Sequence, residues 1–331
     1  MITVRTPFRL PLGGGGTDLP SYYHKYEGFL VTSAINNYMY INVNVPAIVD
    51  KIKINYTKVE IVELNQIDTI QHGIVREVLQ FLKVSGPLEI SSMADLSAGT
   101  GMGSSSAYTV GLLRALNALN RRFISMHDLA EEACKIEIEL LGKPIGKQDQ
   151  YAAAFGGIIT LEINRLGNVT VTPLKINQET VYELENRLMM FYTNIQRDAN
   201  EILAEQSQKA RTDEKVAVDA MHRIKEIGRA IKHALETDNV TEFGKLMHQH
   251  WLEKKRISQK MSSSRIDAWY EKAMHSGALG GKLMGAGGGG FFVFCAENGA
   301  RKTLRTAMEA EGLRYMNFRF DWEGSKLLVN V

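Results

Sequence analysis

The segment Leu96-Ser-Ala-Gly-Thr-Gly-Met-Gly-Ser-Ser-Ser-Ala107 decides how this 331-residue chain is interpreted. Three alternating glycines (Gly99, Gly101 and Gly103) run into three serines, and an apolar helical pattern follows. Glycine lets the backbone turn tightly and bring its N–H groups close to an anion. Serine is a good N-cap, and a helix start carries unpaired N–H groups and partial positive charge. The segment predicts a phosphate-binding loop before a helix over 104–119, against the alternative of a flexible loop before an ordinary helix.

Two common phosphate-binding motifs do not match this segment. A P-loop needs a lysine after its glycines, and none lies between Gly99 and Ala107. A dinucleotide fingerprint needs a strand, then Gly-x-Gly-x-x-Gly, then a helix. The stretch Gly285-x-Gly287-x-x-Gly290 has that spacing, but a strongly apolar strand follows it where a helix is required. A nicotinamide oxidoreductase is therefore disfavoured.

Composition bounds the class of protein. Hydrophobic residues make up 44% and charged residues 23%, which are ordinary globular values, and 331 residues suit two domains. The net charge of +2 argues against nucleic acid as the main partner. No apolar run is long enough to span a membrane, and the N-terminus lacks a signal pattern. Cys134 and Cys295, the only two cysteines, are expected to be buried reduced thiols, which fits a cytoplasmic protein.

Hydrophobic periodicity outlines the order of the elements. Strands are expected over 2–10, 29–45, 52–56, 59–64, 88–92, 156–163, 169–174, 188–193, 291–295, 315–321 and 326–330. Helices are expected over 67–82, 104–119, 127–141, 198–275 and 299–312, with a polar domain junction near 180–186. Strands and helices do not alternate throughout, so α+β is favoured over a doubly wound sheet.

Two carboxylates between the glycine segments are candidate functional groups. Glu137 falls in the middle of the apolar stripe of helix 127–141, where a carboxylate is unfavourable unless it is paired or binds a metal. Pairing with a buried arginine, or reaching solvent at a domain seam, is the alternative. Asp149 stands in Gly142-Lys-Pro-Ile-Gly-Lys-Gln-Asp-Gln150, and a kinase needs such a carboxylate to orient the attacking hydroxyl or accept its proton. A helix cap is the equally open alternative for Asp149.

The N-terminal segment Pro7-Phe-Arg-Leu-Pro-Leu-Gly-Gly-Gly-Gly-Thr-Asp18 is a further candidate. Arg9 lies among apolar residues on an expected strand, and a glycine loop leads to Thr17 and Asp18. Hydroxyl and carboxylate groups beside close backbone suit a sugar or polyol, whereas an ordinary β-turn loop is the plain alternative.

These segments, in this order, resemble the GHMP small-molecule kinases, which include galactokinase, homoserine kinase and mevalonate kinase. The resemblance rests on Pro7 to Asp18, Leu96 to Ala107 and Lys282 to Gly290, and it covers essentially the whole chain. It implies the GHMP kinase fold, with a ribosomal-protein-S5-like α+β domain over 1–183 and a ferredoxin-like α+β domain over 184–331. It also implies ATP and Mg²⁺ as cofactors and an active site between the two domains.

The resemblance assigns roles to residues of this chain. Asp149 would orient or deprotonate the acceptor hydroxyl, and Arg9 would stabilise the charge in transfer. The ATP phosphates would lie against Gly99, Gly101, Met102, Gly103, Ser104, Ser105 and Ser106. Mg²⁺ would be held by Ser105 and Glu137, although the third serine leaves it open which of the three is the ligand. Substrate-binding roles fall on Gly15, Gly16, Thr17, Asp18, Gly287 and Gly288.

The details of the motifs narrow the expected substrate. Gly13 to Gly16 replace the Gly-Glu-His of galactokinases, and the Gly-Gly-Gly-Gly-Thr-Asp and Gly-Lys-Gln-Asp-Gln versions are similar to the bacterial heptose kinases. These phosphorylate the anomeric hydroxyl of D-glycero-D-manno-heptose 7-phosphate for surface polysaccharide synthesis. An L-fucose or other free-hexose 1-kinase and a non-catalytic sugar and ATP sensor are the alternatives. Candidate cations for the existing phosphate are Lys143, Lys147 and Arg197. The sequence leaves the oligomeric state, monomer or homodimer, open.

Overall fold

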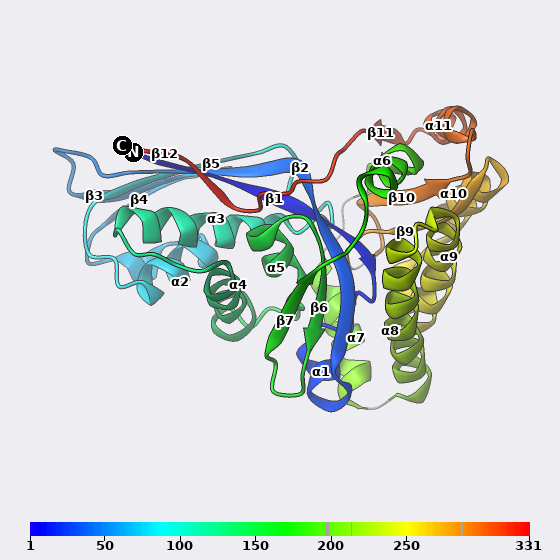
Figure 1. Ribbon diagram of the computed structural model, residues 1–331. Coiled ribbons are helices and arrows are strands. Elements are labelled where there is room, and N and C mark those ends of the chain that lie inside the picture. The colour runs from blue at the N-terminus through cyan, green and yellow to red at the C-terminus, as the bar shows by residue number, and fades with distance from the viewer. Residues whose placement is uncertain (196–198, 213, 286) are drawn as a thin grey trace.

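Strands from about the first half of the chain, with the last strand of the chain, form the first sheet. The computed structural model describes residues 1–195, 199–212, 214–285 and 287–331 (Figure 1). Within them, eight strands form a sheet of order β12-β1-β2-β5-β3-β4, with β6 beside β2 and β7 beside β6. Their bounds are β1 Ile2–Gly13, β2 Gly28–Asn44, β3 Lys51–Asn55, β4 Val59–Glu63, β5 Leu88–Ala94, β6 Ile158–Ile163, β7 Val169–Pro173 and β12 Lys326–Asn330. The first half of the long strand β2 pairs with β6, and its second half pairs with β5.

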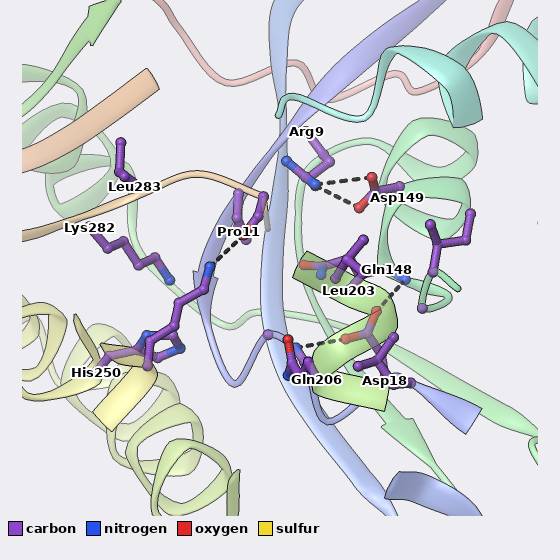
Figure 2. A pocket seen from close by; sticks show the side chains of 17 residues that line it. Arg9, Pro11, Asp18, Gln148, Asp149, Leu203, Gln206, His250, Lys282 and Leu283 are labelled. Carbon is purple, nitrogen blue, oxygen red and sulfur yellow. Dashed lines mark hydrogen bonds and ion pairs between the residues drawn. The ribbon is translucent and has the colours of Figure 1, made fainter. Parts of the chain in front are cut away.

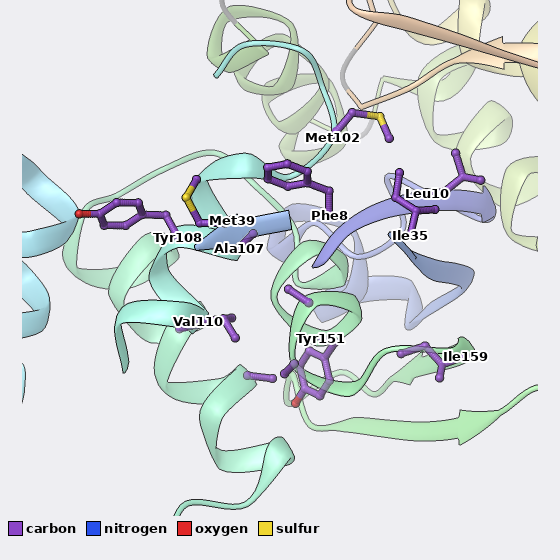
Figure 3. Close-up of a cluster of buried hydrophobic side chains, with 14 of the residues drawn as sticks. Phe8, Leu10, Ile35, Met39, Met102, Ala107, Tyr108, Val110, Tyr151 and Ile159 are labelled. Atoms are coloured by element: carbon purple, nitrogen blue, oxygen red, sulfur yellow. The ribbon is translucent and has the colours of Figure 1, made fainter. Parts of the chain in front are cut away.

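Helices cover one face of this sheet (Figure 1). They are α2 Gly73–Phe81, α3 Ser104–Leu119, α4 Met126–Cys134 and α5 Gln148–Phe155, while the short α1 Pro20–Tyr26 follows the first glycine loop. The buried side chains of β1, β2, α3, α5 and β6 meet in one core, in which Phe8, Ile35, Val110 and Tyr151 are at most 1% exposed (Figure 3). This core fixes the ends of β1, α3 and α5 relative to one another.

The second sheet has the order β11-β8-β10-β9, and all its pairs are antiparallel. Its strands are β8 Leu188–Tyr192, β9 Ala278–Leu283, β10 Phe291–Ala296 and β11 Arg314–Met316. The helices are α6 Gln178–Arg187, α7 Ala199–Arg211, α8 Lys215–Glu236, α9 Val240–Ile257, α10 Ser264–His275 and α11 Arg301–Ala310. From β8 to β11 the strands and the helical segments between them follow the β-α-β-β-α-β pattern of a ferredoxin-like unit. The α+β class and the ferredoxin-like second unit are confirmed.

The C-terminal residues return to the first sheet, which changes the expected division of the chain. Strand β12 pairs antiparallel with β1, and Val331 donates its N–H to the Met1 carbonyl over 3.1 Å. Strand β12, at the end of the expected second domain 184–331, therefore belongs to the first sheet. Its expected start also falls inside α6, which packs against β8, β10 and α9. We propose that the boundary lies between β7 and α6.

The structure differs from the expected elements in several places. The polar stretch 180–186 is helical, because Asn177 caps α6 by accepting the N–H of Thr180 over 2.7 Å. Helix α1 follows directly after the glycine loop and was not expected. The expected strand 315–321 is only β11, followed by a single bridge between Ile35 and Phe320. The expected helix over 67–82 is interrupted between a short 3₁₀ turn, Ile67–Thr69, and α2. The expected long helical stretch 198–275 contains α7 to α10.

Helix 127–141 also changes character along its length. From Lys135 to Leu140 it is a π-helix, in which the Leu141 N–H reaches back to the Ile136 carbonyl. Such widened turns occur frequently at functional sites. Glu137 lies on this turn and is fully buried, as the apolar stripe predicted.

Candidate active site

The predicted phosphate loop connects β5 to α3. Gly99, Gly101 and Gly103 all adopt positive φ, at 79°, 77° and 77°, which a residue with a side chain rarely accepts. Gly103 is the N-cap of α3 and no side chain caps the helix, so the first N–H groups are available to an anion. Met102 and Ser106 are 1% and 2% exposed, and the Met102 side chain lies in the core (Figure 3). These two residues can therefore meet a phosphate only through their backbone.

The third glycine motif packs directly on this loop. A Cβ atom at Gly285 would lie 2.8 Å from the Gly101 carbonyl oxygen, and one at Gly290 would lie 2.3 Å from the Thr100 carbonyl oxygen. Backbone meets backbone here, which only glycine permits. The third glycine motif thus lies directly against the phosphate loop.

A hydroxyl and a carboxylate meet beside the loop. Ser105 donates its hydroxyl to Glu137 Oε1 over 2.5 Å, and the Lys143 ammonium donates to the same two oxygens over 2.6 and 2.9 Å. Gln150 donates to the other Glu137 oxygen over 2.8 Å. Mg²⁺ in proteins binds through one or two carboxylates together with substrate phosphates and waters. The Ser105 hydroxyl and the Glu137 carboxylate, which already contact the Lys143 ammonium, fit such a site. Of the three serines, Ser105 is the one that contacts Glu137.

Arg9 and Asp149 form the centre of the site. Arg9 projects from β1 and Asp149 from the first turn of α5, and two hydrogen bonds of 2.6 and 3.0 Å join the guanidinium to both carboxylate oxygens (Figure 2). Arg9 also donates to the Gly101 carbonyl over 2.5 Å. A Cβ at Gly103 would lie 3.0 Å from Asp149 Oδ2. The pair is thus fixed against the phosphate loop in a bidentate geometry.

A pocket opens in front of this pair (Figure 2). Gly15, Gly16 and Asp18 line it, as expected for a sugar loop. Asp18 accepts the N–H groups of Gly16 and Gln148 over 2.9 and 3.1 Å, while its burial raises the pKa of its carboxyl above the usual value. Asp18 thereby joins the sugar loop to the start of α5.

Several predicted residues lie elsewhere. Thr17 is fully buried and its hydroxyl bonds to the carbonyls of Gly14 and Phe29, so it shapes the loop. Gly287 and Gly288 pack against Met261, while Gly285 lines the pocket. Arg197 lies outside the described residues.

The two candidate lysines form ion pairs with carboxylates. Lys147 pairs with Glu131 over 2.9 Å, away from this pocket, and Lys143 is engaged at Glu137. Both residues therefore already have carboxylate partners.

The pocket also contains residues that the sequence did not single out. His250 and Lys254 come from α9, Lys282 from β9 and Gln206 from α7. Lys254 stands in the run Lys254-Lys255-Arg256, which looks like an exposed helix end. Lys282 is the first residue of the third glycine motif, and its sequence context does not distinguish it from a strand residue beside the glycines.

The chain is similar to kinases of known family along its whole length. A family model described as the GHMP kinases N terminal domain matches residues 70–157, and one described as GHMP kinases C terminal matches 231–313. A D-glycero-alpha-D-manno-heptose 7-phosphate kinase of Campylobacter jejuni is 32% identical over 98% of each chain. The chain belongs to the GHMP kinase family.

Other members are similar over the same length. A galactokinase of Pyrococcus furiosus is 27% identical, covering 99% of this GHMP kinase and 97% of the relative. The crystal structure of a D-glycero-D-manno-heptose 1-phosphate kinase from Bacteroides thetaiotaomicron superimposes with a TM-score of 0.80 at 26% identity, covering 99% of both chains. Among the described residues, no helix is long and apolar enough to cross a membrane, and no three His, Cys, Asp or Glu side chains gather as a metal cluster.

Proposed function

We propose that this GHMP kinase transfers the γ-phosphoryl group of ATP to the anomeric hydroxyl of D-glycero-D-manno-heptose 7-phosphate. The product would be the 1,7-bisphosphate, a precursor of bacterial surface polysaccharide. The full-length similarity to the Campylobacter jejuni heptose 7-phosphate kinase supports this substrate class.

The contact between the Arg9–Asp149 pair and the phosphate loop carries the proposal. The donor's phosphates would lie on the N–H groups at the start of α3, and the acceptor hydroxyl would lie in the pocket beside Asp149. Because Asp149 adjoins Gly103, the hydroxyl and the γ-phosphate would meet at this carboxylate. Phosphoryl transfer depends mainly on such positioning and on charge stabilisation.

Each residue then has a chemical role. Asp149 would orient the hydroxyl and take up its proton as the new O–P bond forms. Arg9 would hold the carboxylate in place and place positive charge near the transferred group. Asp18 would accept hydrogen bonds from sugar hydroxyls. Mg²⁺ held by Ser105 and Glu137 would neutralise charge on the donor's phosphates.

A panel of acceptors tests the proposal. Purified protein is incubated with Mg²⁺ and ATP and with the heptose 7-phosphate, sedoheptulose 7-phosphate, mannose, L-fucose or galactose, and ADP formation is followed. Preferential turnover of the heptose 7-phosphate, with a ³¹P signal of a C1 phosphate in the product, is expected. Turnover of only a free sugar would replace the heptose substrate with a hexose. ATP binding without turnover of any sugar would favour the non-catalytic sensor.

A further inference from the structure

One wall of the pocket is built from two lysines and a histidine that have no carboxylate partner among the described residues. Lys254 and His250 come from the end of α9 and Lys282 comes from β9, and all three line the pocket with Arg9, Asp18 and Asp149. Figure 2 shows Lys282 and His250 across the pocket from Asp149 and Asp18. The catalytic carboxylate and this cationic wall therefore face the same space from opposite sides.

The wall has little that balances its charge. Lys282 is 2% exposed and its ammonium donates to the Leu12 carbonyl over 2.9 Å, while the Lys254 ammonium donates to the Gly285 carbonyl. In the described part of the chain, neither lysine forms an ion pair with a carboxylate. His250 is 2% exposed, and neither of its ring nitrogens has a hydrogen-bond partner among the described residues.

Buried groups in such surroundings resist carrying charge. Burial lowers the pKa of Lys282 well below its usual value, and the positive charges of Lys254 and Arg9 lower it further. Burial likewise lowers the pKa of His250, and the positive charges of Lys282 and Lys254 lower it further. Burying a cation or a ring nitrogen without a partner is unfavourable, and an anion in the pocket would satisfy all three groups at once.

We infer that Lys254, Lys282 and His250 form the subsite for a phosphate monoester already present on the acceptor sugar. This inference rests on the proposed kinase function and names the part of the site that would select a sugar phosphate over a free sugar. The two ammonium groups would pair with the phosphate oxygens, and a neutral His250 would donate one ring N–H. Lysine is a common phosphate ligand, and charge-assisted hydrogen bonds of this kind are among the strong ones.

The position of Lys254, Lys282 and His250 in the pocket suits binding of the acceptor's phosphate better than binding of the phosphates of ATP. The loop before α3 offers its own N–H groups and the Ser105–Glu137 pair to the nucleotide. The cationic wall instead faces the acceptor pocket, on the side away from Asp149. A sugar with its reacting hydroxyl at Asp149 would place a phosphate at its far end against this wall.

The test compares two neighbouring lysines of α9. Lys254→Met removes one cation of the wall, and Lys254 is only partly buried, so the fold should tolerate the change. Lys255→Met is the matched control, because Lys255 pairs with Asp267 over 3.1 Å and does not line the pocket. KM is measured for ATP, for heptose 7-phosphate and for the same heptose without its phosphate.

The expected result is selective. Lys254→Met raises the KM for the heptose 7-phosphate about tenfold or more, as for the loss of one charge-assisted hydrogen bond, and changes the KM for ATP less than about twofold. The preference for the phosphorylated over the free sugar falls by the same factor, and Lys255→Met behaves as the unmodified enzyme. A rise in the KM for ATP alone, or equal losses with both sugars, would overturn the subsite.

A binding experiment separates this inference from the proposed function. Inorganic phosphate is titrated into the protein with ADP and Mg²⁺ present, so that the nucleotide occupies the phosphate loop. If the heptose 7-phosphate is not turned over, the proposed substrate fails, yet phosphate binding that weakens about tenfold in Lys254→Met still supports the subsite. Equal phosphate binding by Lys254→Met and Lys255→Met contradicts it.

Discussion

Gly285→Ala tests how the second unit holds the phosphate loop. Gly285 has φ of +66°, and an added Cβ would lie 2.8 Å from the Gly101 carbonyl oxygen and 3.0 Å from the Gly101 Cα. Both contacts are with backbone, so no flexible side chain can move aside. The strain must be relieved by displacing the phosphate loop or by shifting the turn after β9 that carries Gly285.

The expected destabilisation by Gly285→Ala has two parts, and a comparison with Gly312→Ala separates them. Alanine at positive φ costs about 1 kcal/mol, and overpacking against fixed atoms costs roughly 1–3 kcal/mol more. Gly312 has φ of +83° and no heavy atom within 4 Å of its added Cβ, so Gly312→Ala carries only the first part. The two variants should therefore differ by the overpacking cost of about 1–3 kcal/mol. If the phosphate loop is displaced to relieve this strain, ATP affinity should fall by roughly 5- to 150-fold.

Urea unfolding and the KM for ATP are measured for both variants. Gly312→Ala should lose about 1 kcal/mol of unfolding free energy and keep its KM for ATP. Gly285→Ala should be at least as destabilised and should bind ATP at least about fivefold more weakly. A KM for ATP in Gly285→Ala that matches that of Gly312→Ala would refute the idea that this contact positions the phosphate loop.

Three further predictions concern charge and burial. Burial lowers the pKa of Lys254 from 10.5 to about 8; the charge of Arg9 lowers this pKa further, and the charge of Asp18 raises it. Lys282 and His250 line the same pocket as Lys254. Because the ammonium form is lost as pH rises through this value, the KM for the heptose 7-phosphate should rise about tenfold between roughly pH 7 and pH 9, and a flat profile would contradict the assignment. Glu137→Gln should raise the Mg²⁺ concentration for half-maximal activity about tenfold or more, and an unchanged Mg²⁺ dependence would place the metal elsewhere. Burial raises the pKa of the thiols of Cys134 and Cys295, so a thiol reagent should label both only at the rate of unfolding, and rapid labelling of native protein would show that they are accessible.

The sequence predicted the parts of the site that need particular residue types close together. The alternating glycines before α3 predicted a tightly turning loop, and all three adopt positive φ. Glu137 stood out because a carboxylate on an apolar stripe needs a partner, and it has Ser105, Lys143 and Gln150. These signals are local, so one segment suffices to detect them.

The sequence could not predict features that depend on how distant segments meet. Arg9 and Asp149 are 140 residues apart, and they meet because β1 packs against α5. Lys254 and Lys282 look like a surface lysine and the edge of a glycine motif until α9 and β9 place them in the pocket. Lys147 was a candidate phosphate ligand, but its contact with Glu131 depends on how α4 packs on α5.

The pairing of β12 with β1 also depends on segments far apart in the sequence. Strand β12 alternates in the same way whichever sheet it joins, so its pattern carries no information about β1 as the partner. The π-helical turn at Glu137 likewise has no distinct sequence pattern, because the surrounding residues suit an ordinary helix.

Asp149→Asn tests the central claim most directly, since asparagine keeps the shape of the side chain and removes its capacity to accept a proton. The kcat with heptose 7-phosphate and the Kd of Mg²⁺–ATP are measured on the same preparation. A fall in kcat of about 10²–10⁴-fold, with ATP affinity kept within about threefold, is the predicted result. A kcat within about tenfold of the unmodified enzyme would contradict the role of Asp149 and with it the proposed place of phosphoryl transfer.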